Sequence, residues 1–254
     1  MITVLNGWAV QSIGYSTYLP LGRPEILAEN FDRWQLDEIL VVAIDAGQTG
    51  DGPRLDIVEA ISRMQITTPL SYLGGIRGPG DAKALINAGA DRVVMESLFI
   101  DDPDEAGAVA AAIGRQAVIR AQPMHLENGR VLAHDPRGKY PDRPIDALGL
   151  LESTNQPFSE LFLIDWKNEG KAAAFDSRLL APFLNTDLQL ICFGGISEKT
   201  QVSALFDFDC VSAAAVGNAL SWKELAHRDL MKATEVDAVR AISYGKVTRG
   251  AREW

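Results

Sequence analysis

Two stretches of the chain, ILVVAID (residues 39–45) and LFLID (residues 161–165), decide the fold. Each is an apolar run closed by an aspartate, and Asp165 follows Asp45 at a distance of 120 residues. The same distance separates GGI at 74–76 from GGI at 194–196, and Asn-Gly recurs at 6–7 and 128–129 with an offset of 122. A duplicated and fused half-barrel of four strand-helix units gives this pattern. We therefore expect a single (β/α)8 TIM barrel made of two half-barrels.

Short apolar runs alternate with longer stretches of helical period, which predicts parallel strands linked by helical crossovers. We expect strands near residues 2–5, 38–44, 69–73, 92–96, 117–121, 160–164, 188–193 and 209–214. We expect helices over residues 23–34, 55–64, 81–88, 104–113, 145–152, 175–184, 197–206 and 222–242. The chain, 1–254, is predicted to be one domain, with half-barrels over about 1–115 and 116–245 and a tail over 246–254.

The composition narrows the class of protein. A chain of 254 residues with 47% hydrophobic content can bury a large core, and its formal charge of -10 argues against a nucleic-acid partner. No apolar run approaches the roughly 20 residues that span a bilayer, and no signal segment opens the chain, so we expect no membrane partner and a cytoplasmic location. The two cysteines, Cys192 and Cys210, are expected to be core side chains.

The two Gly-Gly-Ile turns carry the strongest chemical signal. Glycine at the end of a buried strand lets backbone N–H groups approach an anion, with the positive end of a helix behind them. We predict phosphate binding at Gly74, Gly75 and Ser97 in the first half, and at Gly194, Gly195, Ala214 and Ala215 in the second. Glu96, a carboxylate next to Ser97, makes the first-half site the weaker prediction, and the alternative is that the glycines only form tight turns. Replacing Gly194 with a bulky residue should then weaken ligand binding and leave the fold intact.

Asp45 and Asp165 are the candidate catalytic residues. Two carboxylates facing each other across a barrel mouth could act as general acid and base, or each could cap the loop that follows it. The polar segment from 129 to 144 would be the loop after the fifth strand, and either a mobile lid or an inert surface loop fits it. His125, His134 and His227 show no metal-ligand spacing, so no metal site is expected, and no cofactor is expected because dinucleotide-binding turns are absent.

Several of these residues fall into a known order of motifs. The chain carries VLNG (4–7), GRPE (22–25), LGGIR (73–77), AGADRV (88–93) and GG (194–195). In this order the sequence resembles the cyclase subunit of imidazole glycerol phosphate synthase, and it is similar to the related isomerase of histidine biosynthesis. The resemblance extends to about residue 225. It implies a half-barrel duplication that binds a substrate with a phosphate at each end.

The resemblance also shows where this chain departs from the family. The aspartates that serve the family as acid and base at the ends of strands one and five correspond here to Thr3 and to Pro123 or Gln122, and the usual lysine after strand one is Gln11. Proton transfer by a positioned group is worth roughly 10²–10⁴-fold, so the standard reaction should be very slow. Only the family aspartate at the end of strand six has a match, Asp165.

At the floor of the barrel, the residues of this chain agree better with the family. The resemblance implies a ring of charges at the amino ends of the strands that gates ammonia arriving from a glutaminase subunit, and Glu38, Arg92 and Glu160 match it. The alternative is a solvated barrel floor.

Three functions remain open. The first is an ammonia-accepting barrel, a lyase or synthase that partners a glutaminase and binds a phosphorylated or nucleotide-linked sugar. It follows from the resemblance to family paralogues associated with sugar amidation for surface glycans. The second is a cyclase or isomerase of histidine biosynthesis, and the third is a catalytically silent phosphosugar-binding barrel.

Overall fold

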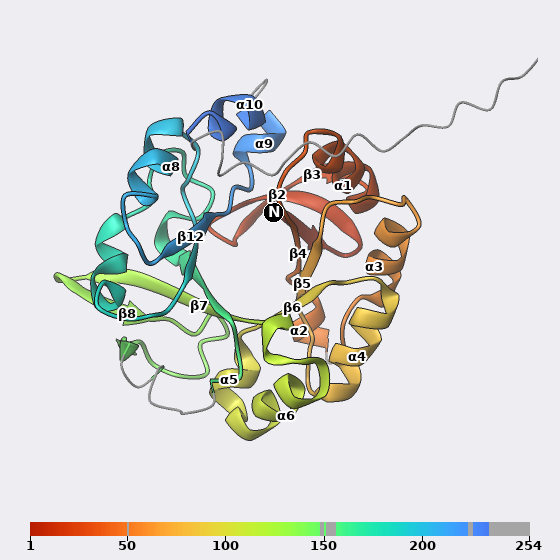
Figure 1. Cartoon of the computed structure of the whole chain (residues 1–254), viewed down its shortest axis with the longest axis horizontal. Coiled ribbons are helices and arrows are strands. Elements are labelled where there is room, and N and C mark those ends of the chain that lie inside the picture. Colours follow the sequence, from red (N-terminus) through yellow and green to blue (C-terminus); the bar gives the residue numbers. More distant parts are fainter. Residues whose placement is uncertain (50, 148–149, 151–155, 223–225, 234–254) are drawn as a thin grey trace, which may run out of the picture.

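The computed structural model of the chain describes residues 1–49, 51–147, 150, 156–222 and 226–233. Parallel strands form a curled sheet around the centre of the molecule, and the helices lie outside it (Figure 1). In their order across the sheet these strands are β12 (Val211–Ala214), β11 (Leu190–Phe193), β10 (Glu160–Asp165), β7 (Val118–Glu127), β6 (Arg92–Met95), β5 (Leu70–Leu73), β4 (Ile39–Ala43) and β1 (Ile2–Leu5). Each is parallel to its neighbour. The expected strands are therefore confirmed.

The described helices follow the strands along the chain. They are α1 (Pro24–Arg33), α2 (Ala46–Thr49), α3 (Leu55–Ser62), α4 (Pro79–Ala88), α5 (Ser97–Asp101), α6 (Pro103–Ile113), α8 (Lys199–Leu205), α9 (Ala219–Trp222) and α10 (Ala226–Met231). Short 3-10 helices are η1 (Arg115–Ala117), η2 (Trp166–Asn168) and η3 (Ser177–Phe183). No helix among the described residues is long and apolar enough to cross a membrane.

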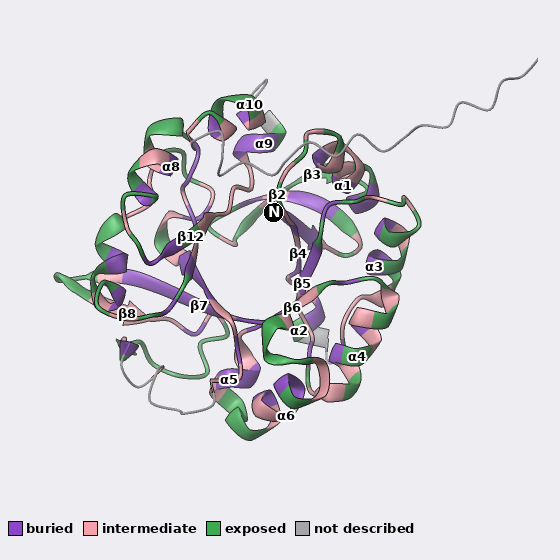
Figure 2. Cartoon of the chain, viewed as in Figure 1, coloured by how far each residue is buried: buried purple, intermediate pink, exposed green. Residues whose placement is uncertain are grey.

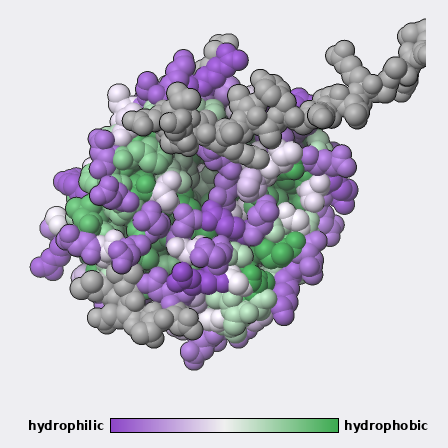
Figure 3. All heavy atoms as spheres, viewed as in Figure 1, coloured by the Kyte–Doolittle hydropathy of each residue, from purple (hydrophilic) through white to green (hydrophobic). Residues whose placement is uncertain are grey.

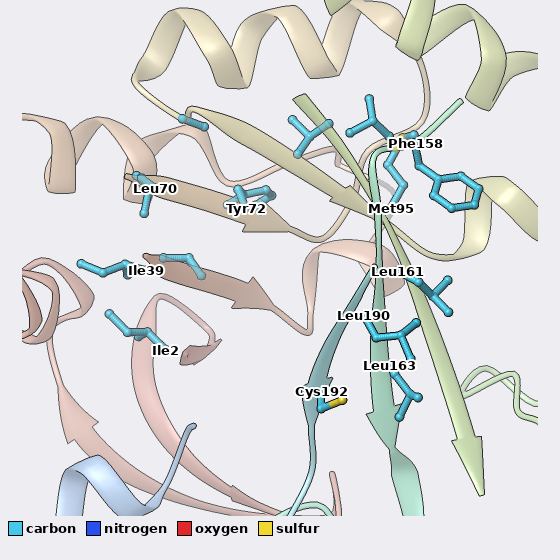
Figure 4. Close-up of a cluster of buried hydrophobic side chains, with 14 of the residues drawn as sticks. Ile2, Ile39, Leu70, Tyr72, Met95, Phe158, Leu161, Leu163, Leu190 and Cys192 are labelled. Carbon is cyan, nitrogen blue, oxygen red and sulfur yellow. The ribbon is translucent and has the colours of Figure 1, made fainter. Parts of the chain in front are cut away.

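The strands are apolar on both faces because each face is covered. Successive side chains of a strand point to opposite sides. In β10, Leu161 and Leu163 belong to the outer cluster under the helices, and Phe162 and Ile164 belong to an inner cluster that lines the inside of the ring. Figure 4 shows part of the outer cluster, and Figure 2 shows that burial is concentrated along the strands and on helix surfaces facing them. The continuous apolar runs of the sequence follow from this double burial.

The repeated Asn-Gly pairs form the same turn in both halves. Asn6 and Gly7 have φ of 51° and 80°, and Asn128 and Gly129 have φ of 49° and 75°. Two successive residues at positive φ are typical of the type I′ turn, which joins antiparallel strands. The first turn joins β1 to β2 (Trp8–Ile13), and the second joins β7 to β8 (Arg130–Ala133). The offset of 122 residues thus marks a repeated hairpin.

The expectation of a closed (β/α)8 barrel is met only in part. A strand has two hydrogen-bonding edges, and those of β1 are taken by β4 and by the antiparallel β2. Among the described residues β1 and β12 form no ladder, and the two ends of the sheet are joined at this seam by a bond from the Met1 amino group to the Val216 carbonyl at 2.8 Å. The fold is a TIM-barrel-like α/β ring with a hairpin on the edge of its first strand.

Two hairpins lie in segments for which no strands were predicted. Residues 8–22 form β2 and β3 (Thr17–Gly22), which were not predicted. The fifth strand continues past Ala121 to Glu127, and the supposed loop of residues 129–144 contains β8 and β9 (Arg143–Pro144). That segment is therefore an extension of the sheet over part of its length.

One helix prediction needs correction. The segment 175–184 forms the 3-10 helix η3, which contains Pro182, a residue without the N–H that an α-helix would use. Within the last predicted helix, 222–242, the described residues are helical at Trp222, which belongs to α9, and over α10 (Ala226–Met231). The other residues of that prediction beyond 233, half of the predicted helix at 145–152 and the tail at 246–254 lie outside the described residues.

Candidate functional site

The amino ends of the strands carry a cluster of charges at the floor of the ring. Arg92 begins β6 on its inner row, where its guanidinium forms ion pairs with Glu38 and Glu160, including an Nε to Glu38 Oε1 hydrogen bond of 3.2 Å. Ser212 Oγ donates to Glu160 Oε1 at 2.8 Å. Burial alone would lower the pKa of Arg92, but the bonds and charges of the two glutamates outweigh it and raise that pKa. The structure brings the three predicted residues together, and their part in admitting ammonia stays a prediction.

Backbone and side-chain donors hold the two candidate aspartates in place. Asp45 Oδ2 accepts a hydrogen bond from the Asn6 backbone N–H at 2.8 Å. Asp165 Oδ2 accepts from Asn168 Nδ2 and from the Asp176 backbone N–H, both at 2.9 Å. Since Ile164 belongs to the inner row, alternation along β10 places Asp165 on the outer side, where burial raises its carboxyl pKa. Asp165 thus caps the loop that follows it, as the alternative expected, whereas Asp45 binds the turn after β1 instead. The acid/base roles of both stay predictions.

The glycine pairs are required by packing in both halves. All four have positive φ, from +68° at Gly75 to +134° at Gly74. A Cβ on Gly194 would lie 2.5 Å from the Asp165 carbonyl oxygen, and one on Gly195 would lie 2.7 Å from the Phe175 nitrogen. Side chains cannot approach backbone atoms so closely. The expectation that a bulky residue at Gly194 leaves the fold intact is therefore at odds with the structure.

The second-half phosphate site contains a carboxylate. Glu169 lines a hollow with Gly195, Ser197 and the loop residues 217–219, and the space left is about 20 Å³, enough for one water molecule. The backbone N–H groups of Ser197 and Glu198 both donate to Gln201 Oε1, at 3.0 and 3.2 Å. A phosphate would have to displace these partners.

The remaining predicted phosphate ligands are dispersed. Ala214 and Ala215 line another cavity, of about 740 Å³, which reaches from the ring interior past Met1 to α8 and α10. Ser97 opens α5, directly after Glu96 and away from these alanines. Phosphate binding at these positions stays a prediction.

The β2–β3 hairpin covers the carboxyl end of the ring. Its tip residue Tyr15 stacks on Trp166 with ring centroids 4.3 Å apart and packs against the inner cluster. Glu169 fixes this tip, because its Oε2 accepts from the Tyr15 backbone N–H at 3.1 Å and from Ser12 Oγ at 3.2 Å. The hairpin therefore fills much of the space in which a ligand of a TIM barrel would bind.

Glu96 is a functional candidate that the sequence analysis used only as an argument against phosphate binding. It follows β6 on the inner row set by Arg92 and Val94, so it faces the mouth. Burial raises its pKa to about 7, with Arg137 lowering and Asp135 raising it. A carboxyl group that titrates near neutral pH can donate or accept a proton. The alternation of β6 was the signal that could have found it.

The positions of the missing family aspartates hold residues that do not ionise. Thr3 pairs with Val42 in the first strand, and Pro123 lies on the inner row of β7 with Ile119 and Ala121. Gln122 faces the other side, where it accepts a weak 3.4 Å bond from Arg120 Nη2. Of the two residues that could stand at the position of the second family aspartate, Pro123 is therefore the one that faces the inside of the ring.

The segment between β8 and β9 is tied to the ring. Arg137 binds Asp101, the last residue of α5, with Nη1 to Oδ2 at 2.5 Å, and donates from Nε to Asp135 Oδ1 at 2.9 Å. Lys139 Nζ reaches the same Asp101 at 3.1 Å. These contacts anchor the segment against the neighbouring β6 loop.

A cluster of histidines and a carboxylate lies on the β7–β9 extension. His134 Nδ1 is 2.8 Å from Asp142 Oδ1, and His125 Nε2 is 3.3 Å from Asp142 Oδ2. One ligand-type atom from each residue lies within 4.8 Å of the others. Burial lowers the pKa of His125. The sequence shows no metal-ligand spacing for these residues, because a hairpin brings together residues that no short motif connects.

The ring of parallel strands, the duplicated turns and the charged floor define a TIM-barrel-like α/β protein with a mouth at the carboxyl ends of its strands. Figure 3 shows one face of this ring, where hydrophilic side chains extend over the centre between hydrophobic ones. The chain belongs to the family described as histidine biosynthesis protein, whose profile matches residues 2–226.

Named relatives agree with this assignment. The chain is 25% identical to the imidazole glycerol phosphate synthase subunit HisF of an Exiguobacterium species, over 85% of each chain. It is 26% identical to the subunit HisF of Limosilactobacillus fermentum, over 88% of this chain and 87% of the relative. The subunit HisF of Corynebacterium urealyticum is also 26% identical, over 86% of this chain and 93% of the relative.

Proposed function

We propose that this protein is an ammonia-using lyase or synthase of the HisF type, which receives ammonia from a glutaminase at its floor and binds a phosphorylated sugar at its mouth. The observation that carries the proposal is the Glu38–Arg92–Glu160 cluster. It places a cation and two carboxylates across the amino-end entrance of the ring, in a family whose named relatives are synthase subunits. Charged groups there can exclude bulk water and ions while they exchange partners to admit a small neutral molecule.

The reaction centre would lie under the β2–β3 hairpin. Substrate entry requires the tip of the hairpin to move, because Tyr15 and Glu169 fill the space above the inner cluster. Once the hairpin opens, Glu169 leaves the hollow beside Gly195, and a phosphate could enter there and take the N–H groups of Ser197 and Glu198 from Gln201 Oε1. Glu96 is the group best placed to transfer a proton, since its pKa of about 7 matches the working pH. Asp165 and Asp45 would then support the loops.

The test is turnover of the histidine-pathway cyclase substrate by the purified chain, with ammonium salt in one assay and glutamine plus a HisF-partner glutaminase in the other. Glu96→Gln should lower both rates by about 10²-fold or more, the share of a proton-transfer group. Arg92→Met should lower the ratio of the glutamine-dependent to the ammonium-dependent rate. Asp45→Asn is the matched control and should leave that ratio unchanged. An Arg92→Met variant with an unaltered ratio would refute the role of the floor.

A histidine-biosynthesis cyclase is the second candidate, and the names of the relatives favour it. Complementation of a strain that lacks the cyclase subunit would support it, and the Glu96→Gln variant should then fail to complement. Neither the family nor these relatives point to amidation of sugars for surface glycans, so the proposal does not include it. Tight binding of a phosphosugar without turnover under either nitrogen source would support the silent barrel instead.

A further inference from the structure

We propose that His125, His134 and Asp142 form a binding site for one divalent transition-metal ion of the Zn²⁺ class. The three residues lie in or next to three neighbouring strands at the rim of the mouth. His125 lies in β7, His134 follows the last residue of β8, and Asp142 precedes the first residue of β9. The proposal does not depend on the proposed function.

The register of the hairpin places all three side chains on one face. Met124 pairs with Ala133, and the His134 N–H donates to the Pro123 carbonyl at 2.9 Å, so His134 stands opposite Pro123. His125, two residues beyond Pro123, points to the same side and is the diagonal neighbour of His134. Ala133 pairs with Arg143, which puts Asp142 opposite His134. That side of β7 continues the inner row of Ile119 and Ala121.

The spacing of the ligand atoms suits a tetrahedral ion. Zinc binds imidazole nitrogen and carboxylate oxygen at about 2.0–2.2 Å, so neighbouring ligand atoms in a tetrahedral site lie roughly 3.3 Å apart. Asp142 lies 2.8 Å from His134 Nδ1 through Oδ1 and 3.3 Å from His125 Nε2 through Oδ2, and one ligand atom from each of the three residues lies within 4.8 Å of the others. The widest of these separations exceeds the tetrahedral spacing by at most about 1.5 Å, so side-chain rotation would draw the three ligand atoms around one ion. Two imidazoles and one carboxylate favour Zn²⁺ and similar ions over Mg²⁺ or Ca²⁺, which prefer oxygen ligands.

The surroundings keep the ligands in place. The His125 ring is buried and meets the His134 ring edge to face, with centroids 5.8 Å apart. The His134 ring packs on Trp166 at 4.9 Å, and Trp166 in turn stacks on Tyr15. Asp142 is about one-third exposed, which leaves a path for the ion from solvent. Three protein ligands leave a fourth position for water or a substrate atom, as in catalytic rather than structural zinc sites.

The experiment measures metal binding directly. The full-length protein is treated with a chelator and titrated with ZnCl2 by isothermal calorimetry, and bound zinc is counted by elemental analysis after dialysis. We expect one zinc per chain for the wild type. Asp142→Asn and His134→Ala should each weaken the affinity by more than about 100-fold, because loss of a direct ligand should exceed the 10–100-fold effect of outer-shell changes. Far-UV circular dichroism confirms that each variant is folded.

His227→Ala is the matched control, since His227 stacks on Trp34 at 4.7 Å, in another part of the ring. This variant should bind zinc like the wild type. Substitution with Co²⁺ gives a second readout, because tetrahedral Co²⁺ has intense visible absorption that should appear in the wild type and be lost in Asp142→Asn. Unchanged zinc affinity in both Asp142→Asn and His134→Ala would overturn the proposal, as would loss of binding in His227→Ala alone.

Discussion

Substitution of Gly194 by alanine tests the packing argument for the Gly-Gly-Ile turns. The new Cβ would lie 2.5 Å from the Asp165 carbonyl oxygen and 3.0 Å from the Asp165 Cβ, and Gly194 has φ of +106°. A non-glycine residue in such a conformation costs about 1–3 kcal/mol, and overpacking costs about as much again. The variant should therefore lose at least about 2 kcal/mol of unfolding free energy. With a urea slope of about 3 kcal/mol per M, its midpoint should fall by at least about 0.7 M.

Gly107→Ala is the matched control. Gly107 lies inside α6, where a Cβ would meet nothing within 4 Å, so alanine should raise the unfolding free energy by about 0.5–1 kcal/mol. Chemical denaturation followed by circular dichroism measures both variants against the wild type. A Gly194→Ala midpoint equal to that of the wild type would show that β10 and β11 are not in the close contact described.

Three further predictions concern charge and stacking. Glu96→Gln should be more stable than the wild type at pH 8 but not at pH 4. The pKa of Glu96 is raised to about 7 in the folded protein, above its value in the unfolded chain. The protonated carboxyl therefore stabilises the wild type by up to about 3 kcal/mol below the unfolded pKa, and this contribution is lost as the pH rises through 7. Urea titrations at the two pH values measure it. Arg92→Met should lower the unfolding free energy by about 2 kcal/mol because it leaves Glu38 and Glu160 unpaired, and added Glu160→Gln should recover part of that loss. Tyr15→Ala should remove the stack on the barrel mouth and speed proteolysis within residues 8–22; equal cleavage rates would contradict this.

The sequence predicted the parallel strands well because a doubly covered strand is a continuous apolar run, as in residues 39–44. It predicted the β2–β3 hairpin poorly, for a physical reason. Trp8 and Leu19 are 55% and 48% exposed, so this hairpin does not show the alternation of apolar and polar residues that marks a half-buried strand. The Asn6-Gly7 turn was a local signal for it, but the pair was noted only as part of the repeat.

The candidate site was predicted unevenly. The floor residues followed from the family resemblance, and the structure joins them through Arg92. Asp165 was placed at the mouth because it ends a strand, yet a period of two puts it on the opposite side from Ile164. The cluster around Asp142 depends on hairpin register, which no short motif encodes.

The β2–β3 hairpin has a consequence for the order of folding. The hairpin directly follows β1, but the residues that hold it in place come late in the chain. The Ser12 hydroxyl donates to Glu169, 157 residues away, and the Ser12 carbonyl accepts a hydrogen bond from Asn218, 206 residues away. Contacts of such long range must wait for the intervening chain, and during synthesis the early segment emerges first. The hairpin at Ser12 and Tyr15 would then lack its anchors until Glu169 and Asn218 are made. In a nascent chain truncated before Glu169, residues 8–22 should therefore be cleaved by proteases faster than in the full-length protein.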